Sequence, residues 1–254
     1  MTTRQERGAV RQLRRFGDAL LSLVYPPVCA GCTSAVSRSP AVCAACWRDL
    51  RFLERPFCEV LGLPFAVDPG AGLVSPEAIA NPPPFARLRG TVLYQGLGSR
   101  LVASLKYGDR TDLVPLMAGW MGRAGAELLA EADLVMPVPL HARRLLRRRF
   151  NQSAELGRHL ARTHGRRFEP MMLRRVRATR SQVGLSASER ERNLRGAFVL
   201  DPHRVADLKG RRVLLVDDVF TTGATVSAAA RTLLRGGAAA VDVLVFARVA
   251  AGGS

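Results

Sequence analysis

The stretch RRVLLVDDVFTTGAT, from Arg211 to Thr225, joins an apolar run, two adjacent acids and a short polar turn. Its first part, Val213 to Val216, is uninterrupted by polar residues, which is typical of a strand buried on both faces of a parallel sheet. Asp217 and Asp218 follow directly. Ligands of open parallel sheets bind beyond the carboxyl ends of the strands, so the stretch predicts an α/β fold and the place of its binding site.

The turn after the acids has the composition of a phosphate-binding loop. Residues 221–225 read TTGAT and lead into a helical pattern. Gly223 lets the backbone approach a ligand closely, and the start of a helix favours an anion. Two carboxylates beside such a loop suit a ribose 5-phosphate, whose hydroxyls or Mg²⁺ they would bind. The alternative, in which Asp217 and Asp218 only end the strand, leaves their mutual repulsion uncompensated.

Strand and helix patterns alternate through the second half of the chain. We expect strands at residues 92–94, 134–139, 212–219 and 240–249, and helices at residues 151–165 and 224–237. Asn151 has the residue type of a helix N-cap, and Gly236 and Gly237 would end the second helix. This alternation predicts a parallel sheet covered by helices on both faces. The sequence shows no internal repeat.

Four of the five cysteines form two matched pairs. Cys29 and Cys32 are separated by two residues, as are Cys43 and Cys46. Two such pairs can complete a tetrahedral sulfur site, which suits a structural Zn²⁺; two disulfides or four buried thiols are the alternatives. Cys58 has Leu61 where a partner would stand, so we interpret it as a relic of a second pair or a buried thiol and assign it no metal.

The composition along the chain predicts four parts. Residues 1–24 form an amphipathic helix, residues 25–61 a four-cysteine zinc-binding domain, residues 62–90 a linker rich in Pro and Gly, and residues 91–254 the α/β domain. The basic N-terminal helix either docks on the protein or binds a membrane surface.

The net charge of +17 favours anionic partners such as phosphates or nucleic acid. A bias towards arginine explains the 36 arginines beside two lysines, but it does not explain the net charge. No run approaches the ~18 to 20 apolar residues of a membrane helix, and residues 1–24 lack the features of a signal peptide. We therefore expect a cytoplasmic protein without a membrane span.

Residues 213–225 closely resemble the phosphoribosyl-pyrophosphate (PRPP) fingerprint of type I phosphoribosyltransferases. The resemblance implies that PRPP binds with Mg²⁺ and that Asp217 and Asp218 contact the ribose hydroxyls. It also implies a 5-phosphate site made by Thr221, Thr222, Gly223, Ala224 and Thr225. Purine-salvage members often have an aspartate where this chain has Thr221, so their mechanism does not carry over directly.

Other motifs, in their order along the chain, resemble the ComF/GntX family. They are the cysteine pairs, SLKYGDR (residues 104–110), PVPLHARRLLRRRFNQS (residues 137–153) and RSQVGLSASERERNLRGAF (residues 180–198). The resemblance implies a type I phosphoribosyltransferase-like parallel sheet flanked by helices, with a small N-terminal zinc ribbon. It also implies a role in natural transformation or the use of external DNA. Arg149 stands where the family usually has glycine.

The same resemblance suggests residues for the pyrophosphate. The basic segment at residues 143–149 would be a loop that cradles it, and residues 177–198 would be a flexible loop that closes over PRPP. The candidates are Lys106, His141, Arg143, Arg144, Gln182 and Asn193. Arg190 is the catalytic candidate, because its charge could stabilise the departing pyrophosphate.

Three hypotheses about function follow. The chain is a phosphoribosyltransferase, or it binds imported single-stranded DNA, or it senses PRPP without turnover. Protein partners in the competence machinery would fit each hypothesis. The acceptor of a phosphoribosyl group has no fixed sequence signature, so the sequence does not identify it.

Overall fold

The computed structural model describes residues 26–67, 70, 72–148, 150–177, 194 and 196–250. These residues belong to two compact units, one ending at Asp49 and one beginning at Leu50. The helix expected over residues 1–24 lies outside the described residues. In the described part of the chain, no helix is long and apolar enough to span a membrane.

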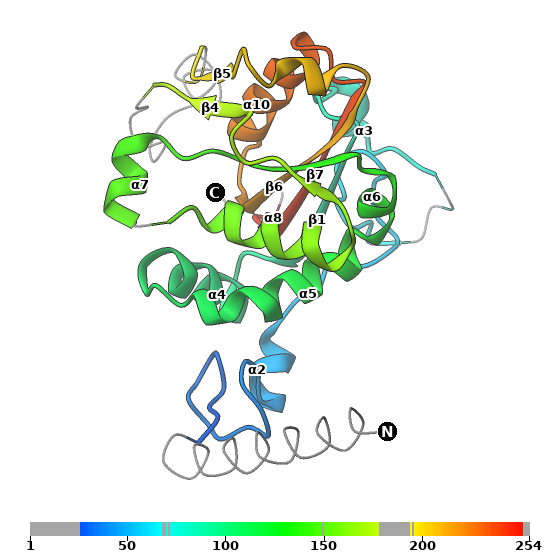
Figure 1. Ribbon diagram of the computed structural model, residues 1–254. Helices are drawn as coiled ribbons and strands as arrows, with labels where there is room; N and C mark the ends of the chain where they lie inside the picture. The colour runs from blue at the N-terminus through cyan, green and yellow to red at the C-terminus, as the bar shows by residue number, and fades with distance from the viewer. Residues whose placement is uncertain are drawn as a thin grey trace, which may run out of the picture. The chain divides into compact units, whose positions relative to one another are not determined.

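A five-stranded parallel sheet forms the centre of the second unit (Figure 1). Its strands, in spatial order, are β1 (Arg87–Leu93), β7 (Ala240–Arg248), β6 (Arg212–Phe220), β2 (Leu134–Pro137) and β3 (Arg167–Phe168). All neighbouring pairs are parallel, which confirms the predicted fold class. The carboxyl ends of β1, β2, β6 and β7 therefore meet at one edge of the sheet.

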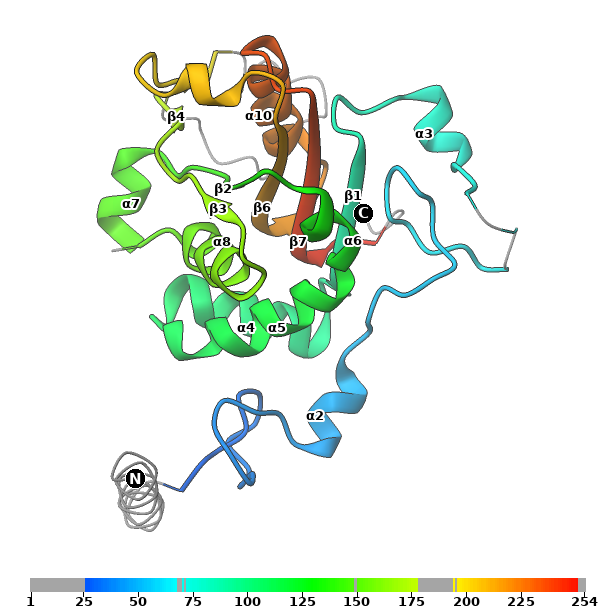
Figure 2. The same cartoon turned by 45° about the vertical axis from the view of Figure 1, so that its right-hand side comes forward.

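Helices cover both faces of this sheet (Figures 1 and 2). On one side lie α4 (Gly96–Tyr107), α5 (Val114–Ala124) and α8 (Gln152–Thr163), and on the other lies α10 (Ala224–Arg235). Smaller elements are α6 (Ala126–Glu131), α7 (Ala142–Arg148), η1 (Thr111–Leu113) and η2 (Val205–Leu208). A separate antiparallel pair joins β4 (Leu173–Arg175) to β5 (Phe198–Leu200).

Apolar side chains from alternate strand positions pack under these helices. Val213 and Leu215 of β6 belong to the same buried cluster as Val226 and Leu233 of α10. On the side of α5, the ring of Trp120 stacks on Phe246, with ring centres 6.3 Å apart. The uninterrupted apolar strands of the sequence therefore serve two cores at once.

The first strand begins earlier than the sequence suggested. We expected a short strand at residues 92–94, but β1 starts at Arg87, inside the segment expected to be a linker. That segment also contains the helix α3 (Pro76–Ala80). Arg87 and Arg89 interrupt the apolar pattern of β1, and the strand tolerates them because each arginine meets carboxylates from elsewhere in the chain.

Of these two arginines, Arg89 depends more on its partners, because its side chain is only 2% exposed. Its guanidinium lies 2.6 Å from Glu59 and 2.6 Å from Glu127, and 4.5 Å from the centre of the Phe57 ring. A buried charge is tolerated only when paired and hydrogen-bonded. The arginine thereby fixes residues 57–59 to the sheet.

We expect Arg89→Met to lower the free energy of unfolding by about 3 kcal/mol, because it leaves Glu59 and Glu127 without their buried cation. Urea denaturation of the zinc-loaded protein, followed by far-UV circular dichroism, measures this change. Arg110→Met is the control, since Arg110 pairs with Asp112 at the surface, and it should cost less than about 1 kcal/mol. Equal, small losses in both variants would contradict the role of Arg89.

Candidate functional site

Asp217 and Asp218 lie at the carboxyl end of β6, and each has a different partner. The ammonium of Lys106, from the last turn of α4, lies 3.0 Å from Oδ1 of Asp218. The hydroxyl of Ser153, at the start of α8, donates to Oδ1 of Asp217 at 2.8 Å. The backbone N–H of Asp218 donates to the same oxygen at 2.9 Å. Three elements thus converge on the two acids.

The two carboxylates make an unusual electrostatic environment. Burial raises the pKa of Asp217 to about 7, with the neighbouring charge of Asp218 acting in the same direction and Ser153 and Lys106 in the opposite one. The acid therefore titrates near neutral pH, so a ligand that donates hydrogen bonds to it would favour its ionised form. Lys106 compensates one of the two charges.

Gly223 shapes the loop that follows. Its φ of 75° is in the left-handed region, and it is the N-cap of α10. A Cβ atom at this position would come within 2.6 Å of the Phe220 ring. Both facts require glycine, which brings the backbone of the loop against the strand end. Thr221 and Thr222 are exposed, so their hydroxyls are accessible to a ligand.

Residues 151–153 connect α8 to this edge of the sheet. Asn151 caps α8 as predicted, accepting from the backbone N–H of Ser153 and donating to the carbonyl of Val138. Gln152 is 1% exposed, and its Nε2 has no hydrogen-bond partner among the described residues. The sequence did not single out Ser153 or Gln152, although both belong to a motif quoted above. Their position directly after the cap was the available signal.

The basic segment before Asn151 is mostly helical, although we expected a loop. Residues 142–148 form α7, because Ala, Leu and Arg are strong helix formers. Arg148 lies 5.2 Å from the centre of the Tyr107 ring, which links α7 to the end of α4. Arg144 is exposed, and His141 is half-buried and precedes the helix. The side chain of Arg143 lies outside the described residues.

Arg175 of β4 is a further basic residue near the acids, and no pattern in the sequence pointed to it. Burial and the positive charge of Arg144 lower its pKa to about 10, while the negative charge of Asp217 acts to raise it. Arg175 pairs in register with Phe198, so the expected loop at residues 177–198 starts and ends at a β-hairpin base. Arg149, Gln182, Arg190 and Asn193 lie outside the described residues.

The four paired cysteines gather in the first unit. The Sγ atoms of Cys29, Cys32, Cys43 and Cys46 all lie within 4.8 Å of one another. Backbone N–H groups of Gly31 and Cys43 donate to Cys29 Sγ. Burial and the other thiols raise the pKa of Cys46, whereas hydrogen bonds from Ser34 lower the pKa of Cys32 to about 6. This donor set fits a tetrahedral structural Zn²⁺.

The backbone around Cys58 repeats the geometry around Cys29. In both places the cysteine N–H donates to the carbonyl five residues on, and the residue four on has a positive φ, 64° at Thr33 and 59° at Gly62. Cys29 Sγ accepts from the N–H of Cys43 at 3.2 Å, and Cys58 Sγ accepts from that of Ser75 at 3.2 Å. The structure therefore contains a repeat that the sequence did not show.

This repeat matches the four cysteines to four other residues. Cys29, Cys32, Cys43 and Cys46 correspond in order and backbone hydrogen bonding to Cys58, Leu61, Ser75 and Ala78. Short helices follow in the same place, α2 (Ala44–Asp49) in the first and α3 in the second. All four residues of the second set are buried, at 0% to 8% exposure. In this second ribbon, residues 58–80, burial of side chains stabilises the fold at the place where the first ribbon would bind zinc.

Comparison with known proteins finds family matches for both the cysteine-containing part and the α/β part of the chain. Family models for a double zinc ribbon domain and a phosphoribosyl transferase domain match residues 20–77 and 157–254. The DNA utilization protein YhgH of Salmonella typhimurium is 36% identical over 89% of this chain and 99% of its own length. Competence protein F of Haemophilus influenzae is 37% identical over 46% of this chain and 50% of its own.

Among solved structures, the allosteric regulatory enzyme of purine biosynthesis aligns with a TM-score of 0.37 at 23% identity. The alignment covers 57% of this chain and 30% of that protein.

The repeat predicts one zinc ion per chain, and a second when its ligands are restored. The triple variant Leu61→Cys, Ser75→Cys, Ala78→Cys adds three thiols to Cys58 in the arrangement of the first ribbon, so we expect two zinc ions per chain by elemental analysis. A control with Val60→Cys in place of Leu61→Cys should stay at one. A folded triple variant with one zinc ion would contradict the repeat.

Proposed function

The chain belongs to the ComF family, and from this premise we propose that it binds PRPP together with Mg²⁺ in the handling of external DNA. The observation that carries this proposal is the pair Asp217 and Asp218 beside the glycine-bent loop at residues 221–225. The carboxylates would accept from the ribose 2- and 3-hydroxyls, and the loop with the first N–H groups of α10 would bind the 5-phosphate.

The surroundings of Asp217 and Asp218 favour a role in binding the two hydroxyls of a ligand over the alternative that the acids only end the strand. Ser153 uses one oxygen of Asp217, and Lys106 uses one oxygen of Asp218, which leaves each carboxylate with capacity to accept further hydrogen bonds. The buried Nε2 of Gln152 is a donor that a ligand oxygen would satisfy. An anionic substrate also matches the basic groups Arg144 and Arg175.

The reaction that this site would support is transfer of the phosphoribosyl group. The bond between the anomeric carbon and pyrophosphate breaks, its electron pair leaves with pyrophosphate, and the acceptor forms the new bond and releases its proton to water. Mg²⁺, held by PRPP and by the carboxylate oxygens of Asp217 and Asp218, would neutralise pyrophosphate charge. Lys106, His141, Arg143, Arg144, Gln182 and Asn193 are proposed to position pyrophosphate, and Arg190 to stabilise its charge.

The names of the relatives favour a role in DNA use, and the net charge of +17 is consistent with an anionic polymer as partner. Single-stranded DNA binding is therefore the second candidate, either alone or with PRPP as a regulator. Protein partners from the competence machinery belong to the same proposal. A zinc site of four cysteines needs reduced thiols, which fits a cytoplasmic location.

We expect PRPP binding to strengthen as pH rises towards 7 and to level off above it, because Asp217 must be ionised to accept from a hydroxyl. Below the midpoint, the association constant falls by up to about tenfold per pH unit. Lys106→Met removes a charge that lowers the pKa of Asp217, so it should move the midpoint to higher pH. Titration calorimetry at a series of pH values on both sides of neutrality measures this.

Lys209→Met, at the chain's other lysine, is the matched control, because Lys209 is exposed and lies outside the elements that meet the acids. The phosphate groups of PRPP titrate identically in all three proteins, so only the difference between midpoints is informative. Coinciding midpoints for wild type and Lys106→Met would contradict the assignment of Asp217.

Pyrophosphate release from PRPP and Mg²⁺, measured across a panel of bases, nucleotides and single-stranded DNA, separates the three functions. A transferase releases pyrophosphate with one acceptor class and loses PRPP binding in the double variant Asp217→Ala, Asp218→Ala. A sensor binds PRPP without release. A DNA-binding protein keeps salt-sensitive DNA binding in the double variant. Unchanged PRPP binding in that variant would contradict the assignment of Asp217 and Asp218 to the PRPP site.

A further inference from the structure

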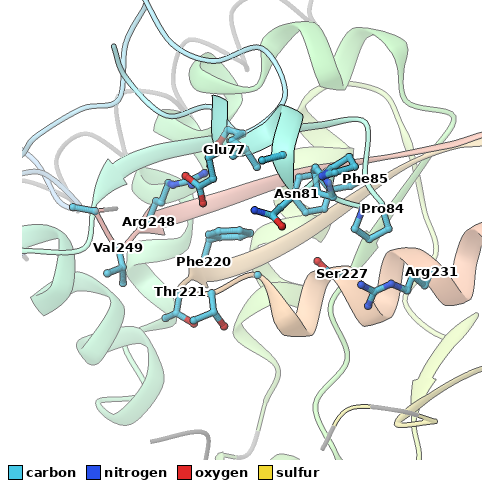
Figure 3. A pocket seen from close by; sticks show the side chains of 17 residues that line it. Glu77, Asn81, Pro84, Phe85, Phe220, Thr221, Ser227, Arg231, Arg248 and Val249 are labelled. Atoms are coloured by element: carbon cyan, nitrogen blue, oxygen red, sulfur yellow. The ribbon is translucent and has the colours of Figure 1, made fainter. Parts of the chain in front are cut away.

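A pocket of about 600 Å³ lies beside the loop at residues 221–223 (Figure 3). Its lining comes from four segments: Leu61, the end of α3 with residues 81–85, the end of β6 with the loop and the first turns of α10, and the end of β7 with residues 249–250. Asp217 and Asp218 are not among the described residues that line it. The pocket and the proposed phosphoribosyl site therefore share the loop but not the acids.

Arg248 is the buried charge of this pocket. It is 5% exposed, its Nη1 donates to the carbonyl of Leu61, and its guanidinium lies 4.7 Å from the centre of the Phe220 ring. Its Nε is buried and has no hydrogen-bond partner among the described residues. Burial lowers its pKa to about 10, so it stays charged at neutral pH. A buried cation with an unsatisfied donor is a site for a ligand oxygen.

The other charged residues of the lining are Arg231 and Glu77 (Figure 3). With Arg248 they give two positive charges and one negative charge, so the pocket is cationic overall. Asn81, Ser227 and the threonines of the loop add neutral polar groups. Thr221 presents a hydroxyl where a carboxylate would repel an anion. The electrostatics of the pocket therefore favour an anionic ligand.

Apolar side chains complete the pocket. Phe85 and Phe220 meet edge to face, with ring centres 6.3 Å apart, and Pro82, Pro83 and Pro84 also line it. Rigid rings of this kind favour a flat ligand, because they offer area without loss of side-chain entropy. The volume is within the range of pockets that hold small molecules.

We propose that this pocket binds the acceptor of the phosphoribosyl group, and that the acceptor is a planar ring with a carboxylate or another anionic oxygen. The proposal rests on the proposed function, because the shared loop would place the ring beside PRPP. Arg231 would hold the anionic oxygen, and Arg248, at the opposite end of the pocket (Figure 3), would donate to a second ligand oxygen. Phe220 and the prolines would contact the ring, and Asn81 would form hydrogen bonds with its polar edge. The wall with Leu61, Glu77 and Ala80 belongs to the second ribbon.

Orotate and uracil test this proposal, because they share a ring and differ by one carboxylate. Their binding to the full-length, zinc-loaded protein is measured by ligand-observed NMR titration without PRPP. We expect orotate to bind at least about tenfold more tightly than uracil. Arg231→Gln should weaken orotate binding about tenfold, and Glu77→Gln should strengthen it, since each changes the pocket's charge at an exposed position.

Arg235→Gln is the matched control, because Arg235 is also exposed on α10 but does not line the pocket. Both decisive variants are at the surface, so folding of a buried Arg248 variant is not needed. Equal or tighter uracil binding, no binding of either ring, or equal effects of Arg231→Gln and Arg235→Gln would overturn the proposal. A separate PRPP titration distinguishes the two failures: orotate binding without PRPP binding would overturn the proposed function and with it the acceptor role, whereas PRPP binding without orotate binding would overturn the assignment of the pocket.

Discussion

Two adjacent carboxylates at the end of a buried strand are the constraint on which this edge of the sheet depends. The loss of water and the charge of Asp218 raise the pKa of Asp217 to about 7, and the hydroxyl of Ser153 and the charge of Lys106 act in the opposite direction. Lys106 and Ser153 come from helices that follow two different strands. The positions of α4 and α8 are therefore tied to the chemistry of β6, and not only to the apolar core.

The two ribbons show how one backbone geometry can be stabilised in two ways. In the first, four cysteine sulfurs lie within 4.8 Å of one another and fit a Zn²⁺ ion, and the metal would supply folding free energy that so short a segment lacks. In the second, Leu61 and Ala78 are buried in the core cluster of the larger unit. Burial of apolar side chains there makes a metal unnecessary, and the second ribbon is left to form a pocket wall.

The sequence predicted the parallel sheet, the cysteine cluster, the cap at Asn151 and the glycine-bent loop, because each has a local pattern. It did not predict contacts made by tertiary structure. The ion pairs of Arg89 with Glu59 and Glu127 join residues far apart in the chain, and so does the electrostatic interaction of Arg175 with Asp217. The sequence pointed to a second ribbon only through Cys58, because the other three matching positions hold Leu61, Ser75 and Ala78 rather than metal ligands.

The charges before and beside the loop at residues 221–223 have opposite signs, and a neutral residue at position 221 is compatible with both. The acids of β6 lie before the loop, whereas Arg231 and Arg248 line the pocket beside it. Thr221 lines the pocket and follows Asp218 by three residues, so a carboxylate there would add a third negative charge to this short segment and would lower the positive charge of the pocket. Threonine keeps a hydrogen-bonding group at that place without either cost, so a neutral residue there is consistent with a diol on one side and an anionic ring on the other.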